Sequence, residues 1–157
     1  FMQLDRMFRR PLTANSGGCP VTSGGLVETA FYSRTYDEAF EMTVEARDYV
    51  ADGLGADREN VAFGERSYFD CEALRLTTRL SQVMAWLLVQ RAVHAGEIGV
   101  NEARHEERRL GGREVCFDND NEIIDGLPPR FRSLMERSLR LYQRIARLDE
   151  MVARGGD

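Results

Sequence analysis

The stretch from Leu74 to Val93 constrains the fold of this chain more than any other feature. Its middle, VMAWLLV at 83–89, is apolar over almost two helical turns. A surface helix of a globular protein needs only one apolar stripe, which faces the core. This stretch therefore predicts a helix that is covered on more than one side. The apolar run is too short to span a bilayer, and Arg79 and Arg91 flank it.

Two long helices are predicted from heptad spacing, in which apolar residues recur in steps of three and four. The first of these two runs from about Arg66 to Ala95, and the other runs from Pro128-Pro129 to about Arg154. The expected seam of the Arg66 helix is Phe69, Ala73, Leu76, Leu80, Val83 and Leu87, continued by Gln90 and His94. The expected seam of the Pro128 helix is Phe131, Leu134, Ser138, Leu141, Ile145, Leu148 and Val152.

An earlier helix is predicted from about Tyr36 to Asp52. Thr35 followed by Glu38 has the pattern of a capping box, which marks a helix start. The expected apolar residues of this helix are Phe40, Val44 and Ala51, with Tyr36 and Val50 alongside, and Gly53 and Gly55 are expected to end it.

The domain organisation follows from these helices. Residues 1–30 are rich in Gly, Ser and Thr and are predicted to be a flexible arm; residues 31–154 form one domain, and 155–157 a short tail. A loop with one helical turn from Asp57 is expected over 53–65, a short helix over 102–109, and an acidic loop over 110–127. Because no segment alternates with period two, we expect an all-α fold: an antiparallel three-helix bundle with long second and third helices.

Composition excludes several kinds of chemistry. The chain has no lysine, so a Schiff base or a P-loop lysine is impossible. The three cysteines are far apart, which suits a reducing compartment, and no signal peptide is visible, so we expect a cytoplasmic protein. The net charge of −5 argues against broad nucleic-acid binding.

No motif predicts a catalytic, cofactor or metal site. The only histidines, His94 and His105, belong to no His/Cys cluster. The run DNDNE at 118–122 resembles the start of an EF-hand loop, but Ile123 and Pro129 replace its glycine and closing glutamate. We therefore interpret it as a solvated acidic loop, and we expect that the protein is not an enzyme.

The back of the Arg66 helix is the first candidate interaction surface. Opposite the seam it carries Cys71, Arg75, Thr78 and Gln82, and then the apolar residues Ala85, Leu88, Val89 and Ala92. A three-helix bundle does not cover this face, so we predict a homodimer through Ala85, Leu88, Val89 and Ala92. The alternative is an intramolecular lid made by the N-terminal arm or by the helix near Glu102.

The arginines of the last helix are the second candidate surface. Arg130, Arg137 and Arg144 share one heptad position, and Arg140, Arg147 and Arg154 share a neighbouring one. They form either a solvated face partly paired with carboxylates of the first helix or the acidic loop, or a docking surface for an acidic partner. The partner-binding candidates are Arg137, Arg140, Arg144 and Arg147, with Asp118, Asp120 and Glu122 of the acidic loop.

Several blocks, which follow one another in order along the sequence, resemble the RcdA family. The name RcdA means regulator of CtrA degradation, and the family belongs to alphaproteobacteria. The blocks are EARDYV at 45–50, the stretch 74–93, GEI at 96–98, and LPPRF and SLRLYQRIARLD within 127–149. The resemblance covers roughly residues 31–150. It implies a dimeric three-helix bundle that is not an enzyme and acts as an adaptor around the ClpXP protease.

The expected function is therefore delivery of cell-cycle regulators to ClpXP by protein–protein binding. The expected partners are a ClpX-bound priming adaptor, cargo regulators and a second copy of the chain, with no membrane and no cofactor. The alternative is a helical nucleic-acid-binding regulator that uses the arginines of the last helix.

Overall fold

The computed structural model describes residues 23–117 and 126–154, with side chains from residue 31 onward. Every regular element in these ranges is helical, and they contain no strand, which confirms the all-α prediction. Three predicted parts lie outside the described residues: residues 1–22 of the arm, the acidic residues Asp118, Asp120 and Glu122, and the tail. The long helices are α2 (Ser23–Asp52), α4 (Arg66–His94) and α8 (Pro129–Arg154); the short ones are α3 (Leu54–Asn60), α5 (Val100–Ala103) and α6 (Arg113–Cys116), with 3-10 turns at Phe63–Glu65 and Glu106–Arg108.

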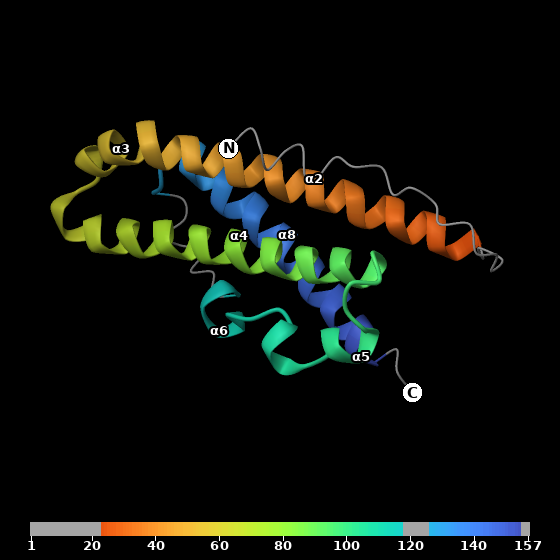
Figure 1. Cartoon of the computed structure of the whole chain (residues 1–157). Helices are drawn as coiled ribbons and strands as arrows, with labels where there is room; N and C mark the ends of the chain where they lie inside the picture. Colours follow the sequence, from red (N-terminus) through yellow and green to blue (C-terminus); the bar gives the residue numbers. More distant parts are fainter. Residues whose placement is uncertain (1–22, 118–125, 155–157) are drawn as a thin grey trace.

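The three long helices all pack against one another, but they are not all antiparallel (Figure 1). The ring of Phe69 lies 4.8 Å from that of Phe131, and further along both helices Trp86 bonds to Asp149. These contacts advance in the same direction along α4 and α8, so the two helices run parallel. Helix α2 is antiparallel to both, and the prediction of three antiparallel helices is wrong for the α4–α8 pair.

The parallel arrangement is possible because the chain between α4 and α8 is long enough to run back along the bundle. We call residues 95–117 the crossover segment. It contains α5 and α6, and both of these contact α4 (Figure 1). The return path lets α8 start at the same end of the bundle as α4. The short helix expected over 102–109 is instead divided between α5 and the 3-10 turn at Glu106–Arg108.

The bounds of α4 and α8 agree with the sequence predictions to within a residue or two. Five of the six predicted apolar seam residues of α4 are buried, and Ala73 is partly buried against the core. The prediction missed the burial of Glu72, Arg79 and Trp86. Because α4 packs against two long helices and the crossover segment, its buried face is wider than a two-column seam.

Helix α2 begins earlier than predicted. Thr35 is buried inside the helix, where its hydroxyl donates to the Phe31 carbonyl at 3.0 Å, one turn before it. It is therefore not an N-cap, and the resemblance of Thr35 and Glu38 to a capping box was misleading. Residues 23–30, which were predicted as part of the arm, are helical.

The buried face of α2 also differs from the prediction. Phe40 and Val50 are exposed, and Ala51 is exposed as well. The residues that face the core are Thr35, Ala39, Met42, Ala46 and Tyr49. Two of these are alanines, which permit close helix packing while contributing little to an apolar pattern in the sequence.

Residues 53–65 are more ordered than the predicted loop. Helix α3 starts at Leu54, three residues before the predicted turn at Asp57. The Tyr49 hydroxyl donates to Asp57 at 2.6 Å, and Arg58 forms two hydrogen bonds with Asp70 of α4, at 2.7 and 2.9 Å. These bonds fix the turn between α2 and α4 and so hold the first two long helices together.

Candidate interaction surfaces

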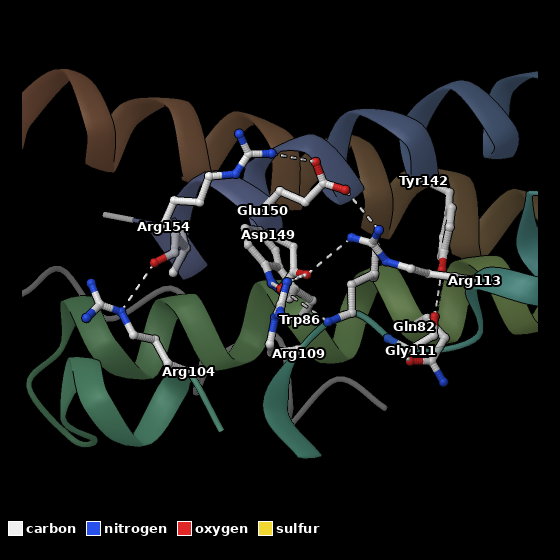
Figure 2. A network of polar contacts seen from close by, with 12 residues as sticks. Gln82, Trp86, Arg104, Arg109, Gly111, Arg113, Tyr142, Asp149, Glu150 and Arg154 are labelled. Carbon is white, nitrogen blue, oxygen red and sulfur yellow. Dashed lines mark hydrogen bonds and ion pairs between the residues drawn. The ribbon is translucent and has the colours of Figure 1, made fainter. Parts of the chain in front are cut away.

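Asp149 of α8 is the centre of a buried polar cluster that attaches the crossover segment to the bundle (Figure 2). One carboxylate oxygen accepts from the Trp86 indole nitrogen at 2.9 Å and from the Leu110 amide at 3.3 Å. The other accepts from Arg109 at 2.9 Å and lies 3.6 Å from Arg113. A buried carboxylate is stable only when it is paired and hydrogen-bonded in this way.

The Gly111 peptide group is held from both sides. Its amide donates to the Gln82 side-chain oxygen of α4 at 3.2 Å, and its carbonyl accepts from the Tyr142 hydroxyl of α8 at 2.6 Å. A Cβ atom at residue 111 would lie 2.9 Å from that Gln82 oxygen, so a larger residue would require the Gln82 side chain to shift. Burial raises the pKa of Tyr142, which keeps the hydroxyl protonated as a donor.

The crossover segment covers part of the back of α4. A Cβ atom on Gly112 would lie 3.6 Å from Gln82 and 3.7 Å from Thr78. Arg79, which is buried, donates to the carbonyl of Cys116 at 2.8 Å. Thr78 and Gln82 of the predicted back face are thus approached by the crossover segment, which is a different segment from the arm or the Glu102 helix that were considered as lids, whereas Cys71 stays exposed.

The second half of the back of α4 is more open. Ala85 is exposed, Leu88 is 39% exposed, and Val89 and Ala92 are half-buried. Tyr36 of α2 stacks on Phe40 with ring centres 6.3 Å apart, and it also meets α4, because the Arg91 guanidinium lies 5.7 Å from the centre of the Tyr36 ring. Of the four predicted dimer contacts, Ala85 and Leu88 are the exposed ones.

The arginines of α8 divide into two columns. We call Arg130, Arg137 and Arg144 the inner column, because each contacts α2. Arg137 binds Glu45 at 2.8 Å, Arg144 binds Glu38, and the Arg130 guanidinium lies 5.4 Å from the centre of the Tyr49 ring. This is the pairing with first-helix carboxylates that was one of the two sequence interpretations.

We call Arg140, Arg147 and Arg154 the outer column. Among the described residues, Arg140 and Arg154 form ion pairs only with carboxylates of α8 itself, Glu136 at 3.8 Å and Glu150 at 3.3 Å. Arg147 is exposed and forms no ion pair with any residue that the structure describes. The side chains of Arg140 and Arg154 are 67% and 80% exposed, compared with 38% for Arg137 and 37% for Arg144.

The remaining reactive side chains form no site in the described ranges. Cys71 is exposed, whereas Cys116 is buried and its burial raises the pKa of the thiol, which disfavours the reactive thiolate. His94 was predicted to be partly buried on the seam; it is exposed, although its ring lies 4.9 Å from that of Tyr32. Within residues 23–117 and 126–154, no group of three His, Cys, Asp or Glu side chains could hold a metal ion.

The helices of the described ranges also include none that is long and apolar enough to cross a membrane. Of the acidic loop, the described part includes Glu114, which is exposed on α6. The predicted partner-binding residues of this loop, Asp118, Asp120 and Glu122, lie outside the described residues.

Comparisons with known proteins show similarity to a family model and to a solved structure. The sequence model of a family described as "Protein of unknown function (DUF1465)" matches residues 25–157. The crystal structure of RcdA from Caulobacter crescentus CB15 is similar, with 31% sequence identity and a TM-score of 0.62. The match covers 77% of this chain and 89% of the RcdA chain. No curated protein matches the sequence.

Proposed function

Because this chain belongs to the RcdA-like family, we propose that it is a non-enzymatic adaptor that helps to deliver cell-cycle regulators to the ClpXP protease. The observation that carries this proposal is the match to RcdA, which extends over most of both chains. The resemblance recognised in the sequence blocks of 45–50, 74–93 and 127–149 implies the same role. We place this activity in the cytoplasm of an alphaproteobacterium.

The proposed mechanism is binding alone. One surface engages a priming adaptor that is already bound to ClpX, and another surface holds the cargo regulator. Joining the two raises the effective concentration of the cargo at the unfoldase, which can increase overall affinity by orders of magnitude without a new contact. The proposed partner surfaces are those of Arg140 and Arg147, and of Asp118, Asp120 and Glu122. The other two predicted arginines, Arg137 and Arg144, pair with carboxylates of α2 instead.

A reconstituted degradation assay tests this function. Purified ClpXP, the priming adaptor and a candidate cargo regulator are mixed with and without the protein, and the half-life of the cargo is measured. We expect the half-life to fall when the protein is added and to be restored when the priming adaptor is omitted. A cargo half-life that does not respond to the protein with any of the response regulators of the same genome would refute the proposal.

We further propose that the molecule works as a dimeric three-helix bundle. The supporting observation is that the apolar residues Ala85 and Leu88, on the back of α4, are exposed. Small residues such as Ala85 and Ala92 allow close approach of a helix from a second copy. The dimer contacts would be Ala85, Leu88, Val89 and Ala92.

Light scattering at micromolar concentration tests the dimer. We expect the mass of two chains for the unmodified protein and the mass of one chain for Leu88→Glu. The matched control is Phe63→Glu, which places the same charge at an apolar residue that is 86% exposed on the turn before α4. A monomeric mass for the unmodified protein, or an unchanged mass for Leu88→Glu, contradicts this interface.

The alternative of a nucleic-acid-binding regulator is not favoured by the comparisons. Arg137 and Arg144 also form ion pairs with α2, so fewer arginines of α8 are left for the basic surface that nucleic-acid binding needs.

A further inference from the structure

The outer column of α8 lies on the side of the helix that is turned away from the core. At about 100° per residue, Arg147 lies nearly opposite the buried Asp149. Arg140 and Arg154 are seven residues before and after Arg147, so the three side chains project from nearly the same line. Successive arginines in this line are about 10.5 Å apart along the helix axis.

Among the residues that the structure describes, no carboxylate of another element pairs with this column. Its carboxylate partners are Glu136 and Glu150, each one helical turn from an arginine, and such exposed pairs contribute little. Glu150 is also shared with Arg113 of the crossover segment at 2.9 Å. Within the described residues, positive charge is therefore in excess on this face, in a chain whose net charge is −5.

An apolar side chain lies within the same column. Met151 is 67% exposed, and it is four residues after Arg147 and three before Arg154, so it neighbours both on the helix surface. Exposed methionine and arginine are both enriched at the centres of protein interfaces. A phosphate backbone would use the arginines but would gain little from Met151, so this combination favours a protein partner.

We propose that the outer column, with Met151, docks an acidic helical segment of a protein partner. A helix with carboxylates seven residues apart matches the arginine spacing of about 10.5 Å, and each guanidinium fork can bind one carboxylate. An apolar residue between the carboxylates would contact Met151. The proposal rests on the proposed adaptor function, and it specifies the chemistry of one protein that such an adaptor would bind.

A binding experiment with a defined probe tests this inference. The probe is a fluorescein-labelled 21-residue helical peptide that carries Glu at three positions seven residues apart, each followed four residues later by Leu. The comparison peptide has Gln at the three positions. We expect the Glu peptide to bind at least 10-fold more tightly by fluorescence anisotropy, and its affinity to fall as salt is added.

Variants of the chain locate the binding site. Arg147→Glu is expected to weaken binding of the Glu peptide at least 10-fold, and Met151→Ser several-fold. Arg47→Glu is the matched control: it makes the same charge change at an exposed arginine whose ion pair is with its neighbour Asp48. We expect it to leave binding unchanged. Circular dichroism identifies any variant that fails to fold. If Arg147→Glu fails to fold, Arg147→Gln is used in its place.

Three outcomes would overturn the inference. They are equal binding of the Glu and Gln peptides, unchanged binding by Arg147→Glu, or tighter binding of a 20-base-pair DNA duplex than of the Glu peptide. The peptide test and the degradation assay can fail independently. If the protein binds the Glu peptide but does not change cargo degradation, only the proposed adaptor function is refuted. Stimulation of degradation that is unaffected by Arg147→Glu refutes only the docking site.

Discussion

The two arginine columns of α8 have the same residue type, the same seven-residue spacing and the same helix, but different surroundings. The inner column meets Glu45, Glu38 and the Tyr49 ring, all on α2. In the part of the chain that the structure describes, Arg140 and Arg154 of the outer column meet carboxylates of α8 alone, and Arg147 meets none. Tertiary neighbours that are about a hundred residues away in sequence therefore decide which arginines help to hold the fold and which remain available to a partner.

The largest effect is expected where arginines approach a buried carboxylate, namely where Arg109 and Arg113 approach Asp149. Asp149→Ala leaves the Trp86 indole N–H, the Leu110 amide and Arg109 without their acceptor. Breaking a buried pair on one side costs about 3–5 kcal/mol. We expect a loss of that size in the free energy of unfolding measured in urea.

The control for this variant is Glu150→Ala, the adjacent residue, whose ion pairs are at the surface. It is expected to cost much less than Asp149→Ala, because solvent screens exposed ion pairs. A loss below 1 kcal/mol for Asp149→Ala would show that the crossover segment does not depend on this carboxylate.

The next effect concerns the inner column. Arg137→Gln combined with Arg144→Gln removes both ion pairs with α2, and the side chains involved are more than a third exposed. Exposed pairs contribute about 0.2–1 kcal/mol each. We expect a combined loss of about 1 kcal/mol in low salt, which shrinks when the urea titration is repeated in 0.5 M salt. A loss that does not depend on salt would point to packing of the side-chain stems instead.

Sequence patterns could predict the long helices but not their partners. The bounds of α4 and α8 were predictable because Gly96 and Pro129 lie at their ends and heptad spacing lies between them. The division of the arginines into two columns was also visible. Which column pairs with α2 was not, because the buried face of α2 includes two alanines, Ala39 and Ala46, that give little apolar signal, and it was mistaken for the side that carries Phe40.

The Asp149 cluster and the direction of α8 had no periodic signal. Trp86 and Asp149 are single positions whose pairing spans 63 residues, and no local pattern joins them. The parallel arrangement of α4 and α8 depends on the path of the crossover segment. Its signal was the length of the connection, together with Gly111-Gly112, where Gly112 has a positive φ of 74°. A short loop would have forced an antiparallel neighbour, whereas this connection permits either direction.

A smaller effect is expected at Glu150, which lies between the crossover segment and the outer column. The hydrogen bond from Arg113 is the main cause that lowers the pKa of Glu150 below 4.5, and the charge of Arg154 adds to it. A lowered pKa means that Glu150 stabilises the fold above pH 4.5. This contribution is lost as the pH falls through the lower value of the folded state.

A carbon-detected NMR titration of the Glu150 carboxyl group measures this pKa. We expect Arg113→Gln to raise the pKa toward 4.5, and Arg154→Gln to raise it less, because only Arg113 bonds at short range. If Arg154→Gln raises the pKa of Glu150 more than Arg113→Gln does, Glu150 interacts mainly with the outer column. Arg154 would then be less available to a partner than we infer.

The smallest effect on stability is expected at Arg147. Because it forms no ion pair with the described residues, Arg147→Gln removes no contact that the fold uses. Surface changes of this kind alter the free energy of unfolding by less than about 0.5 kcal/mol. Urea unfolding of Arg147→Gln, compared with Arg144→Gln, therefore measures the difference between the columns at two residues three positions apart. If Arg147→Gln is as costly as Arg144→Gln, the outer column takes part in the fold, and its availability for a partner is no longer supported. If it is neutral, the loss of peptide binding in the same variant can be assigned to the missing guanidinium and not to a weakened bundle.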